Sequence, residues 1–389
     1  MINSKKIIWG VVVLIALVAI AFFSMKKSPE APDTATKNED TGPIKVGVIL
    51  PLTGDGAVYG EPARNIYQMA VVEINAADGV GGRMLELVVE DSKCTGETAV
   101  SAAQKLINVD KVKVIIGGFC SSESLAATPV AANAKVVLFS PGSSSPDLTG
   151  ASPFFFRNYP SDASQGTVLA RIAYNDKKYK TVAFIQEQTD YAAGVYKAFN
   201  EEFTKLGGTV TNESFPTKNT DFRAIVTKIK DAKPDAVFID TQTPAVGTRI
   251  MQQSEQLQYK PALIVNDVIS GDPDTVTQNA EFLEGALTAE FGIDPQNQKF
   301  QHLITAYKEK YGQEPPYQSY AQTEYDAVFM VRDALLANGE DGEKIAKWSR
   351  TVKDWEGASG KITILPSGDR DGGHSPRVIK SGKVAPYTK

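Results

Sequence analysis

Two cysteines and the serines that follow them mark the part of the sequence with the clearest chemistry. Cys94 ends a strand-like run, LELVVEDSKC, and Cys120 ends a second one, VKVIIGGFC. Ser121 and Ser122 come directly after Cys120, at the start of an expected helix. The run AKVVLFS then leads into PGSSSPDLTG, a second hydroxyl-rich stretch. Its three consecutive serines are Ser143, Ser144 and Ser145.

This spacing predicts a site for a small anionic group. Open α/β sheets bind ligands at the carboxyl ends of their strands, beside helix N-termini. The first turn of a helix offers unpaired N–H groups and the positive end of a dipole. Two hydroxyl-rich loops on adjacent strand ends therefore suit one carboxylate. A plainer interpretation stays open, in which Ser121 and Ser122 only cap the helix and PGSSSPDLTG is an ordinary turn.

Length, composition and charge exclude several classes of function. The 389 residues suffice for two domains with full cores, and 42% hydrophobic with 22% charged residues is typical of globular proteins. A net charge of -5 without a basic cluster argues against a nucleic acid partner. The two histidines, His302 and His374, lie far apart, so we expect both at the surface and no histidine-rich metal site.

Catalytic motifs are absent from the sequence. There is no G-x-S-x-G, H-E-x-x-H, P-loop or G-x-G-x-x-G pattern. Ser121 has no neighbouring histidine to act as its base. We therefore expect a protein that is not an enzyme and that carries no metal and no cofactor.

The N-terminal segment predicts attachment to a membrane. An uninterrupted apolar run over 7–23 follows Lys5 and Lys6, which favours an uncleaved signal anchor over 1–27 rather than a cleaved signal peptide. The polar stretch over 28–43 is typical of a disordered tether. An extracytoplasmic, oxidising location makes Cys94 and Cys120 a disulfide candidate, although two unrelated buried thiols remain the alternative.

The rest of the chain alternates apolar strands with helical patterns, which indicates an α/β protein. Strands apolar on both faces, with helices between them, indicate parallel sheets covered on both sides. The first series has expected strands over 45–50, 84–90, 112–117 and 136–140, with helices over 60–77, 97–109 and 122–133. The second has strands over 181–186, 209–213, 236–240 and 262–265, with helices over 164–174, 192–206, 221–231 and 245–257.

The last part of the chain, over 286–389, is too small and too mixed for a third domain. Its patterns predict a strand over 285–291, helices over 298–311 and 319–337, and a β-like ending. We expect it to return to the first two series, so that both domains are discontinuous. The predicted architecture is two doubly wound, Rossmann-like lobes joined by a hinge. The expected lobes comprise 44–161 with 290–364, and 162–289 with 365–389.

From about residue 44 onward, the sequence resembles the leucine/isoleucine/valine-binding proteins of ABC transporters. The stretches that carry the resemblance are IKVGVILPLTGDGAVYG, VVEINAADGVGGRMLELVVEDSKC, GGFCSSES, LFSPGSSSPDLT, DFRAIVTKIKDAKPDAVFID and YAQTEYDAVFM. The ordered set is far more specific than any single motif. It implies a type I periplasmic-binding fold that closes around a small ligand and is recognised by a membrane permease. It also implies that the protein is a monomer.

The resemblance also implies roles for individual residues. Cys94 and Cys120 match the disulfide of the family. Ser121 and Ser144 match positions that bind the carboxylate of an amino acid, and Ser143 lies beside the second of them. The remaining matches are aromatic or acidic residues of the ligand cleft. Tyr59 would cover the ligand side chain, Tyr191 would reach the cleft from the second lobe, and Asp267 would bind the ammonium.

Two departures from the family pattern bear on the ligand. Asp267 stands where the branched-chain binders have glutamate, which keeps the charge and shortens the reach. DTQTPAVG replaces a tyrosine-rich loop, which puts Gln242 and Thr243 in aromatic positions. The resemblance therefore implies a branched-chain-like or small polar amino acid. The alternative is a ligand-sensing receptor domain of the same fold that binds an amide or another small solute for signalling.

Overall fold

The computed structural model describes residues 42–389, of which Pro43–Lys389 form one compact unit. The expected signal anchor over 1–27, and all but the end of the tether over 28–43, lie outside the described residues. Within the described part of the chain, no helix combines the length and the apolar character needed to span a bilayer.

The first sheet has five parallel strands in the order β2-β1-β3-β4-β5. These strands are β1 (Ile44–Leu50), β2 (Leu85–Asp91), β3 (Val114–Gly117), β4 (Val137–Ser140) and β5 (Phe155–Arg157). The connecting helices are α2 (Ala57–Ala76), α3 (Gly96–Asn108) and α4 (Ser121–Asn133), with the short turn η1 (Pro146–Leu148) after β4. The order 2-1-3-4-5 is one of the two common doubly wound arrangements.

The second sheet has seven strands in the order β14-β13-β10-β9-β8-β6-β7. These are β6 (Thr181–Glu187), β7 (Thr209–Phe215), β8 (Ala236–Asp240), β9 (Leu263–Val265), β10 (Leu287–Glu290), β13 (Ser375–Lys380) and β14 (Lys383–Pro386). Strands β6 to β10 are parallel and repeat the 2-1-3-4-5 order of the first sheet. Strands β13 and β14 extend the sheet in antiparallel fashion, so this sheet is mixed.

Seven helices and one π-helical turn connect the strands of the second sheet. They are α5 (Asp162–Arg171), η2 (Ile172–Asp176), α6 (Asp190–Lys205), α7 (Arg223–Ala232), α8 (Pro244–Gln256), α9 (Asp267–Ser270), α10 (Pro273–Gln278) and α11 (Ala280–Leu283). The helix expected over 164–174 is therefore α5 followed by η2.

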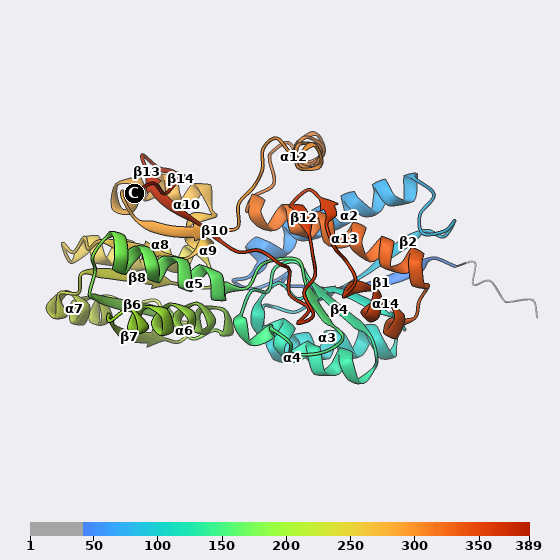
Figure 1. Ribbon diagram of the computed structural model, residues 1–389, viewed down its shortest axis with the longest axis horizontal. Coiled ribbons are helices and arrows are strands. Elements are labelled where there is room, and N and C mark those ends of the chain that lie inside the picture. Colours follow the sequence, from blue (N-terminus) through green and yellow to red (C-terminus); the bar gives the residue numbers. More distant parts are fainter. Residues whose placement is uncertain (1–41) are drawn as a thin grey trace, which may run out of the picture. The chain divides into compact units, whose positions relative to one another are not determined.

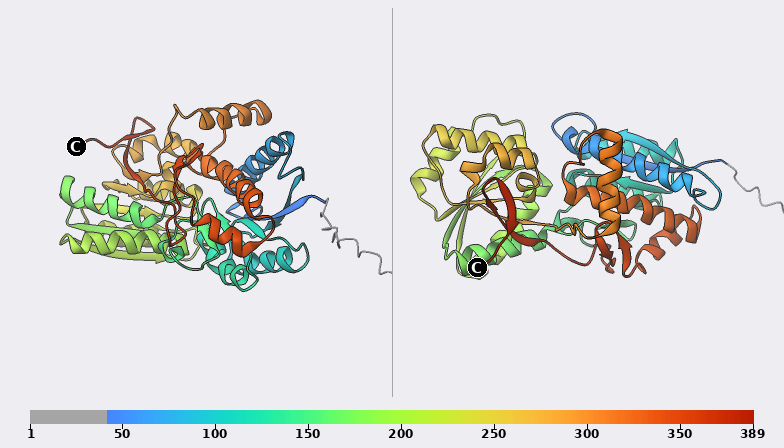
Figure 2. Two further views of the ribbon diagram at one scale, coloured as in Figure 1. Left: turned by 45° about the vertical axis from the view of Figure 1, so that its right-hand side comes forward. Right: turned by 90° about the horizontal axis from the view of Figure 1, so that it is seen from above.

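The C-terminal part returns to both sheets, as expected from the sequence. Helices α12 (Gln298–Tyr311), α13 (Gln318–Asn338) and α14 (Gly342–Ser349) contribute to the core of the first sheet, and β13 pairs with β10 of the second. A small hairpin, β11 (Trp355–Gly357) and β12 (Gly360–Ile362), precedes the return. Figures 1 and 2 show the red C-terminal segment running from the first sheet to the second.

Each sheet has an apolar cluster on both of its faces, as the continuous apolar strands predict. Val46 and Val48 of β1 point to one cluster, which includes α2 and α13, and Ile49 points to the other, which includes α3 and α4. In β6, Ala183 and Val182 likewise belong to clusters on opposite faces. This alternation follows from the two-residue period of a strand.

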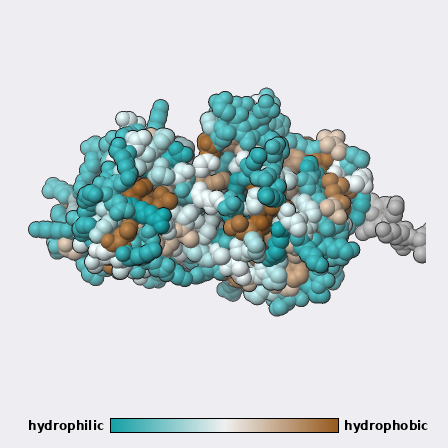
Figure 3. Space-filling view, in the orientation of Figure 1, coloured by the Kyte–Doolittle hydropathy of each residue, from teal (hydrophilic) through white to brown (hydrophobic). Residues whose placement is uncertain are grey.

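The chain crosses between the two sheets three times, over 158–161, 291–297 and 363–374. We call the part built on the first sheet lobe 1 and the part built on the second lobe 2. Hydrophilic residues cover most of the face drawn in Figure 3, on both lobes, with smaller hydrophobic patches among them.

Candidate ligand-binding site

A small cavity lies between the lobes, where residues from both of them meet. Its volume is about 10 Å³, close to the smallest space that holds one water. Most of the residues expected to bind ligand surround it. The lining residues are Tyr59, Phe119, Ser121, Gly142, Ser144, Tyr191, Gln242, Val268 and Tyr320.

Ser121 is held in place by the covalent and hydrogen-bonded start of α4. Cys94 and Cys120 form the expected disulfide, with their Cα atoms 5.5 Å apart, directly before Ser121. Glu123 closes the first turn by accepting from the backbone N–H of Cys120 at 2.9 Å. The Ser121 hydroxyl is buried and accepts from the backbone N–H of Ser145 at 3.1 Å, which joins the two hydroxyl-rich loops.

Ser143 and Ser144 are neighbours in sequence but face different surroundings. The Ser143 hydroxyl lies 2.9 Å from the carbonyl oxygen of Gly118 and 2.8 Å from the hydroxyl of Ser124. It binds the loop after β3 and does not line the cavity. Ser144 does line it, and its carbonyl oxygen accepts from the backbone N–H of Asp162 at 2.8 Å.

Asp267 is the centre of a group of tyrosine hydroxyls. It begins the short helix α9, which Asn266 caps. Its carboxylate accepts from Tyr191 at 2.6 Å, from Tyr159 at 2.8 Å and from Tyr320 at 3.1 Å. Three hydroxyl donors on one buried carboxylate stabilise its charge in a place that water does not reach.

The loop with Gln242 closes the cavity from lobe 2 through its backbone. The Tyr59 hydroxyl donates to the carbonyl oxygen of Gln242 at 3.0 Å, and the N–H of Gln242 donates to Glu187 at 2.7 Å. Burial raises the pKa of Glu187 to about 7. Thr243 is buried and lines a neighbouring pocket rather than the small cavity.

The prediction that both histidines lie at the surface is wrong for His374. His302 is exposed, with 55% of its side chain accessible, and lies 3.1 Å from Glu73. His374 is buried, because the last crossover passes between the lobes before β13. Burial lowers the pKa of His374 to about 4, so the ring is neutral at physiological pH.

His374 lies among polar side chains. Its Nδ1 atom is 2.7 Å from the Ser164 hydroxyl, which lies 2.9 Å from the carbonyl oxygen of Ser161. Its Nε2 atom is 3.7 Å from Asp162 and 3.9 Å from Asp267. Burial and the charge of Asp267 raise the pKa of Asp162 well above its ordinary value.

Acidic residues end four neighbouring strands of lobe 2. Glu187, Asp240 and Glu290 are the last residues of β6, β8 and β10, and Asp267 follows β9. Burial raises the pKa of Glu187 and Glu290 to about 7 and that of Asp240 further above its ordinary value. The wall of the cleft on lobe 2 is therefore acidic, whereas that on lobe 1 carries hydroxyls and aromatic rings.

Several aromatic residues complete the site, and the sequence did not predict their role. Tyr159 stacks on Tyr320 with ring centroids 4.5 Å apart, and Phe119 stacks on Tyr59 at 4.6 Å. Tyr320 opens the stretch YAQTEY, which carried part of the resemblance, so that stretch could have indicated it. Tyr159 lies in a crossover, where neither periodicity nor a motif gave a signal.

Comparison with known proteins identifies the family. The family model described as periplasmic binding protein matches residues 43–379. The chain belongs to the periplasmic binding protein family. Its two lobes, each built on a doubly wound sheet, have the type I fold of this family, as the sequence resemblance implied.

Several periplasmic binding proteins are similar to this one over most of their length. An amino acid binding protein of Pseudomonas aeruginosa is 30% identical over 312 residues, which are 79% of this chain and 82% of that protein. The crystal structure of a leucine binding protein from Thermotoga maritima has a TM-score of 0.80 at 31% identity, covering 89% of this chain and 98% of that one. A branched-chain amino acid transporter substrate binding protein from Streptococcus pneumoniae, in complex with isoleucine, has a TM-score of 0.78 at 27% identity, covering 88% and 97%.

Proposed function

We propose that this periplasmic binding protein is the extracytoplasmic substrate-binding protein of an ABC transporter and that it closes around an amino acid. The observation that carries the proposal is the composition of one cavity. Ser121 and Ser144 line it from lobe 1. Tyr191 lines it from lobe 2 and Tyr320 from α13, and both of these tyrosines bind Asp267 behind the cavity wall. Hydroxyls and helix N–H groups suit a carboxylate, and the Asp267 carboxylate suits an ammonium.

Ligand entry requires the lobes to part. A cavity of about 10 Å³ is far below the roughly 300 Å³ at which ligand pockets begin. Tyr59 contacts Gln242, and Tyr320 contacts Asp267, across the two lobes. An entering ammonium would take the place of tyrosine hydroxyls on Asp267, and an entering carboxylate would take donors from the loops of Ser121 and Ser144. The ligand would then hold the lobes closed, and a membrane permease would bind that form.

The division of the chain supports hinge closure. We propose the lobes predicted from the sequence, 44–161 with 290–364 and 162–289 with 365–389, since these limits fall in or beside the three crossovers. Gln242 places a polar side chain in the cavity wall. It therefore favours small or polar amino acids as ligands, in addition to the branched-chain amino acids that similar proteins bind. We propose Tyr59, Gln242 and Val268 as contacts of the ligand side chain.

A ligand panel tests the function. We expect leucine, isoleucine, threonine or alanine to raise the unfolding temperature of the protein, because bound ligand stabilises the folded state by mass action. An amino acid without its carboxylate, such as isopentylamine, and one without its ammonium, such as 4-methylpentanoate, should bind the central cavity far more weakly. If amides or sugars raise the temperature and no amino acid does, the proposed ligand class is wrong.

Replacement of the acidic group sharpens the test. Asp267→Asn should weaken amino acid binding by about tenfold or more, because a charge-assisted hydrogen bond contributes about 1.5–3 kcal/mol. Asp231→Asn is the matched control, since Asp231 is exposed on α7. Calorimetric titration of both variants measures the difference. Equal affinities for the two variants would remove Asp267 from the ligand site.

A further inference from the structure

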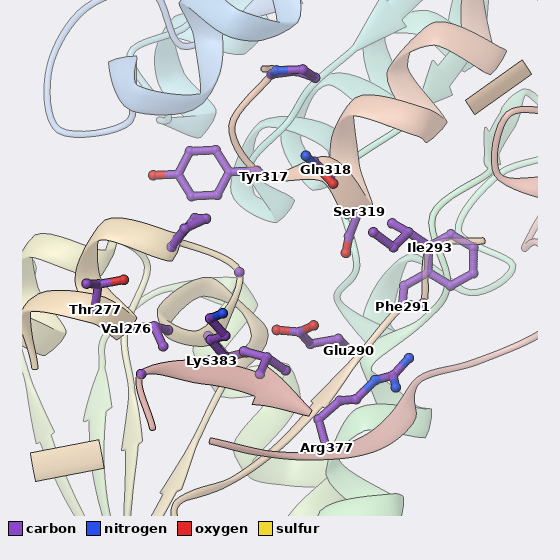
Figure 4. A pocket seen from close by; sticks show the side chains of 17 residues that line it. Val276, Thr277, Glu290, Phe291, Ile293, Tyr317, Gln318, Ser319, Arg377 and Lys383 are labelled. Carbon is purple, nitrogen blue, oxygen red and sulfur yellow. The ribbon is translucent and has the colours of Figure 1, made fainter. Parts of the chain in front are cut away.

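A second and larger pocket lies beside the central cavity. Its volume is about 580 Å³, within the range of roughly 300–1,000 Å³ that small-molecule sites occupy. Among the described residues, it shares no lining residue with the central cavity. Lobe 2 contributes α9, α10 and the strands β13 and β14, and residues 315–319 before and within α13 contribute the opposite wall. Figure 4 shows this arrangement.

Glu290 enters the pocket as a buried carboxyl group that lacks a complete set of partners. It is the last residue of β10, beside the hydroxyl pair of Ser270 and Thr288, whose oxygens are 2.8 Å apart. The Oε1 atom is buried without a hydrogen-bond partner. In Figure 4 the carboxyl group points into the pocket, on the side of Lys383. A buried polar atom without a partner costs about 1–3 kcal/mol, so a ligand that satisfies it gains affinity.

Two cationic side chains line the same pocket. Arg377 is half-buried on β13 and Lys383 is exposed at the start of β14. Within residues 42–389, neither of them forms an ion pair. Glu290 is paired with Ser375, and Arg377 with Thr288, so the two charged groups are diagonal neighbours on one face of the sheet. Diagonal residues of a sheet lie about 7–8 Å apart, within reach of long side chains, so one small ligand group can contact both of them.

An apolar wall completes the pocket. Val276, Phe291 and Ile293 line it, and Figure 4 shows Phe291 and Ile293 on the side opposite Val276. Ile293 is 38% exposed, although it is a large apolar residue. A ligand with an apolar body would remove this surface from water, which is favourable by about 25 cal/mol per Å².

We propose that this pocket is a second ligand site and that it binds a small carboxylate with an apolar body. The carboxylate would lie between Arg377 and Glu290, with Lys383 adding positive charge from the rim. The pocket is lined by two positively charged side chains and one carboxyl group, so it favours an anionic ligand over an amine. Glu290 assists because burial raises its pKa to about 7, so its protonated form donates a hydrogen bond to the ligand.

The choice of ligand separates this site from the central cavity. We would titrate 4-methylpentanoate, which is leucine without its amino group, into the full folded protein, with and without saturating leucine. This compound has no ammonium for Asp267, so the central cavity is not its site. The proposal expects saturable binding that leucine does not compete away. Isopentylamine, which has the same apolar body and a positive charge, should not bind this pocket.

Variants of the lining assign the binding to the pocket. Arg377→Gln and Lys383→Gln should each weaken 4-methylpentanoate binding, with Arg377→Gln causing a loss of about tenfold, the value of one charge-assisted hydrogen bond. Lys380→Gln is the matched control, because Lys380 is exposed on β13 and does not line the pocket. At a pH well below about 7, where Glu290 is protonated with or without the charge of Asp267, Asp267→Asn should leave this binding unchanged, although it weakens amino acid binding.

The pH dependence gives an independent measurement. Asp267 raises the pKa of Glu290, Arg377 lowers it, and Lys383 faces the same pocket. Affinity for the carboxylate should fall as pH rises through about 7, and Glu290→Gln should remove most of this dependence. No binding by the wild type, binding that leucine displaces, or equal loss in Asp267→Asn and Arg377→Gln would overturn the proposal. None of these results decides whether amino acids bind the central cavity, which the titration with amino acids tests separately.

Discussion

The Tyr59 hydroxyl donates to the carbonyl oxygen of Gln242 at 3.0 Å, and this buried hydrogen bond joins lobe 1 to lobe 2. It is made by a side chain on one lobe and the backbone of the other. Parting the lobes therefore breaks it, whereas the internal packing of each lobe is unaffected.

Tyr59→Phe should shift the unliganded protein toward the open form. The loss of one neutral hydrogen bond destabilises the closed form by about 1 kcal/mol. The radius of gyration from X-ray scattering, measured without ligand, should increase relative to the wild type. Tyr311→Phe is the control, because the Tyr311 hydroxyl bonds the carbonyl of Asn65 within lobe 1. Equal radii for all three proteins would show that this bond does not hold the lobes together.

The three serines of the predicted carboxylate site should differ in their effects. Ser121→Ala and Ser144→Ala should each weaken amino acid binding by about 1–3 kcal/mol, since both line the central cavity and would meet a charged group. Ser143→Ala should instead lower the free energy of unfolding, because its hydroxyl binds the Gly118 carbonyl. Calorimetric titration and urea unfolding separate the two effects. Unchanged affinity in both Ser121→Ala and Ser144→Ala would place the carboxylate elsewhere.

The disulfide should contribute to stability more than to binding. Cys94 and Cys120 are 26 residues apart, and the chain-entropy model gives about 3.5 kcal/mol for a loop of this length. The double variant Cys94→Ala, Cys120→Ala should lose roughly that much free energy of unfolding. Thiol titration of the denatured, unreduced wild type should detect no free thiol. Two titratable thiols would contradict the bond.

Glu324 should make the stability of the protein depend on pH. It is buried on α13, and burial raises its pKa to about 8. A carboxyl group with a raised pKa in the folded state stabilises the fold at low pH, and this contribution is lost as pH rises from about 4.5 to about 8. The unfolding temperature should therefore fall over this range, and the fall should be smaller in Glu324→Gln. Glu314→Gln, at an exposed position, is the control; identical profiles for the two variants would exclude this role.

Local patterns were sufficient to predict most of the elements and the return of the chain. Apolar strands such as Val137–Ser140 and helix starts such as Ser121 are determined by neighbouring residues. The closeness of Ser121 to Ser144 followed from the geometry of parallel sheets, whereas the order of the strands was not predicted. In the structure, Ser121 and Ser144 line the same central cavity, and the disulfide directly precedes Ser121.

Residues that act through long-range contacts could not be predicted in the same way. His374 is buried because the final crossover passes between the lobes, and nothing in its own neighbourhood in the sequence indicates this. Tyr159 reaches Asp267 from a position 108 residues away in the chain. The second pocket combines α10, β13 and the start of α13, which are separated by long stretches of sequence.

The three crossovers also set the order in which the protein can be completed. During synthesis, the strands of lobe 1 emerge first, but α13, which packs on α2, follows only after most of lobe 2. The apolar face that includes Val46 and Val48 therefore stays uncovered until α13 has been synthesised. At about 5–20 residues per second, this delay lasts roughly ten seconds or more. During this delay the uncovered face could aggregate with other chains. We therefore expect chains truncated before α12 to bind chaperones more strongly than the full-length chain. A pull-down from a translation extract would measure this difference.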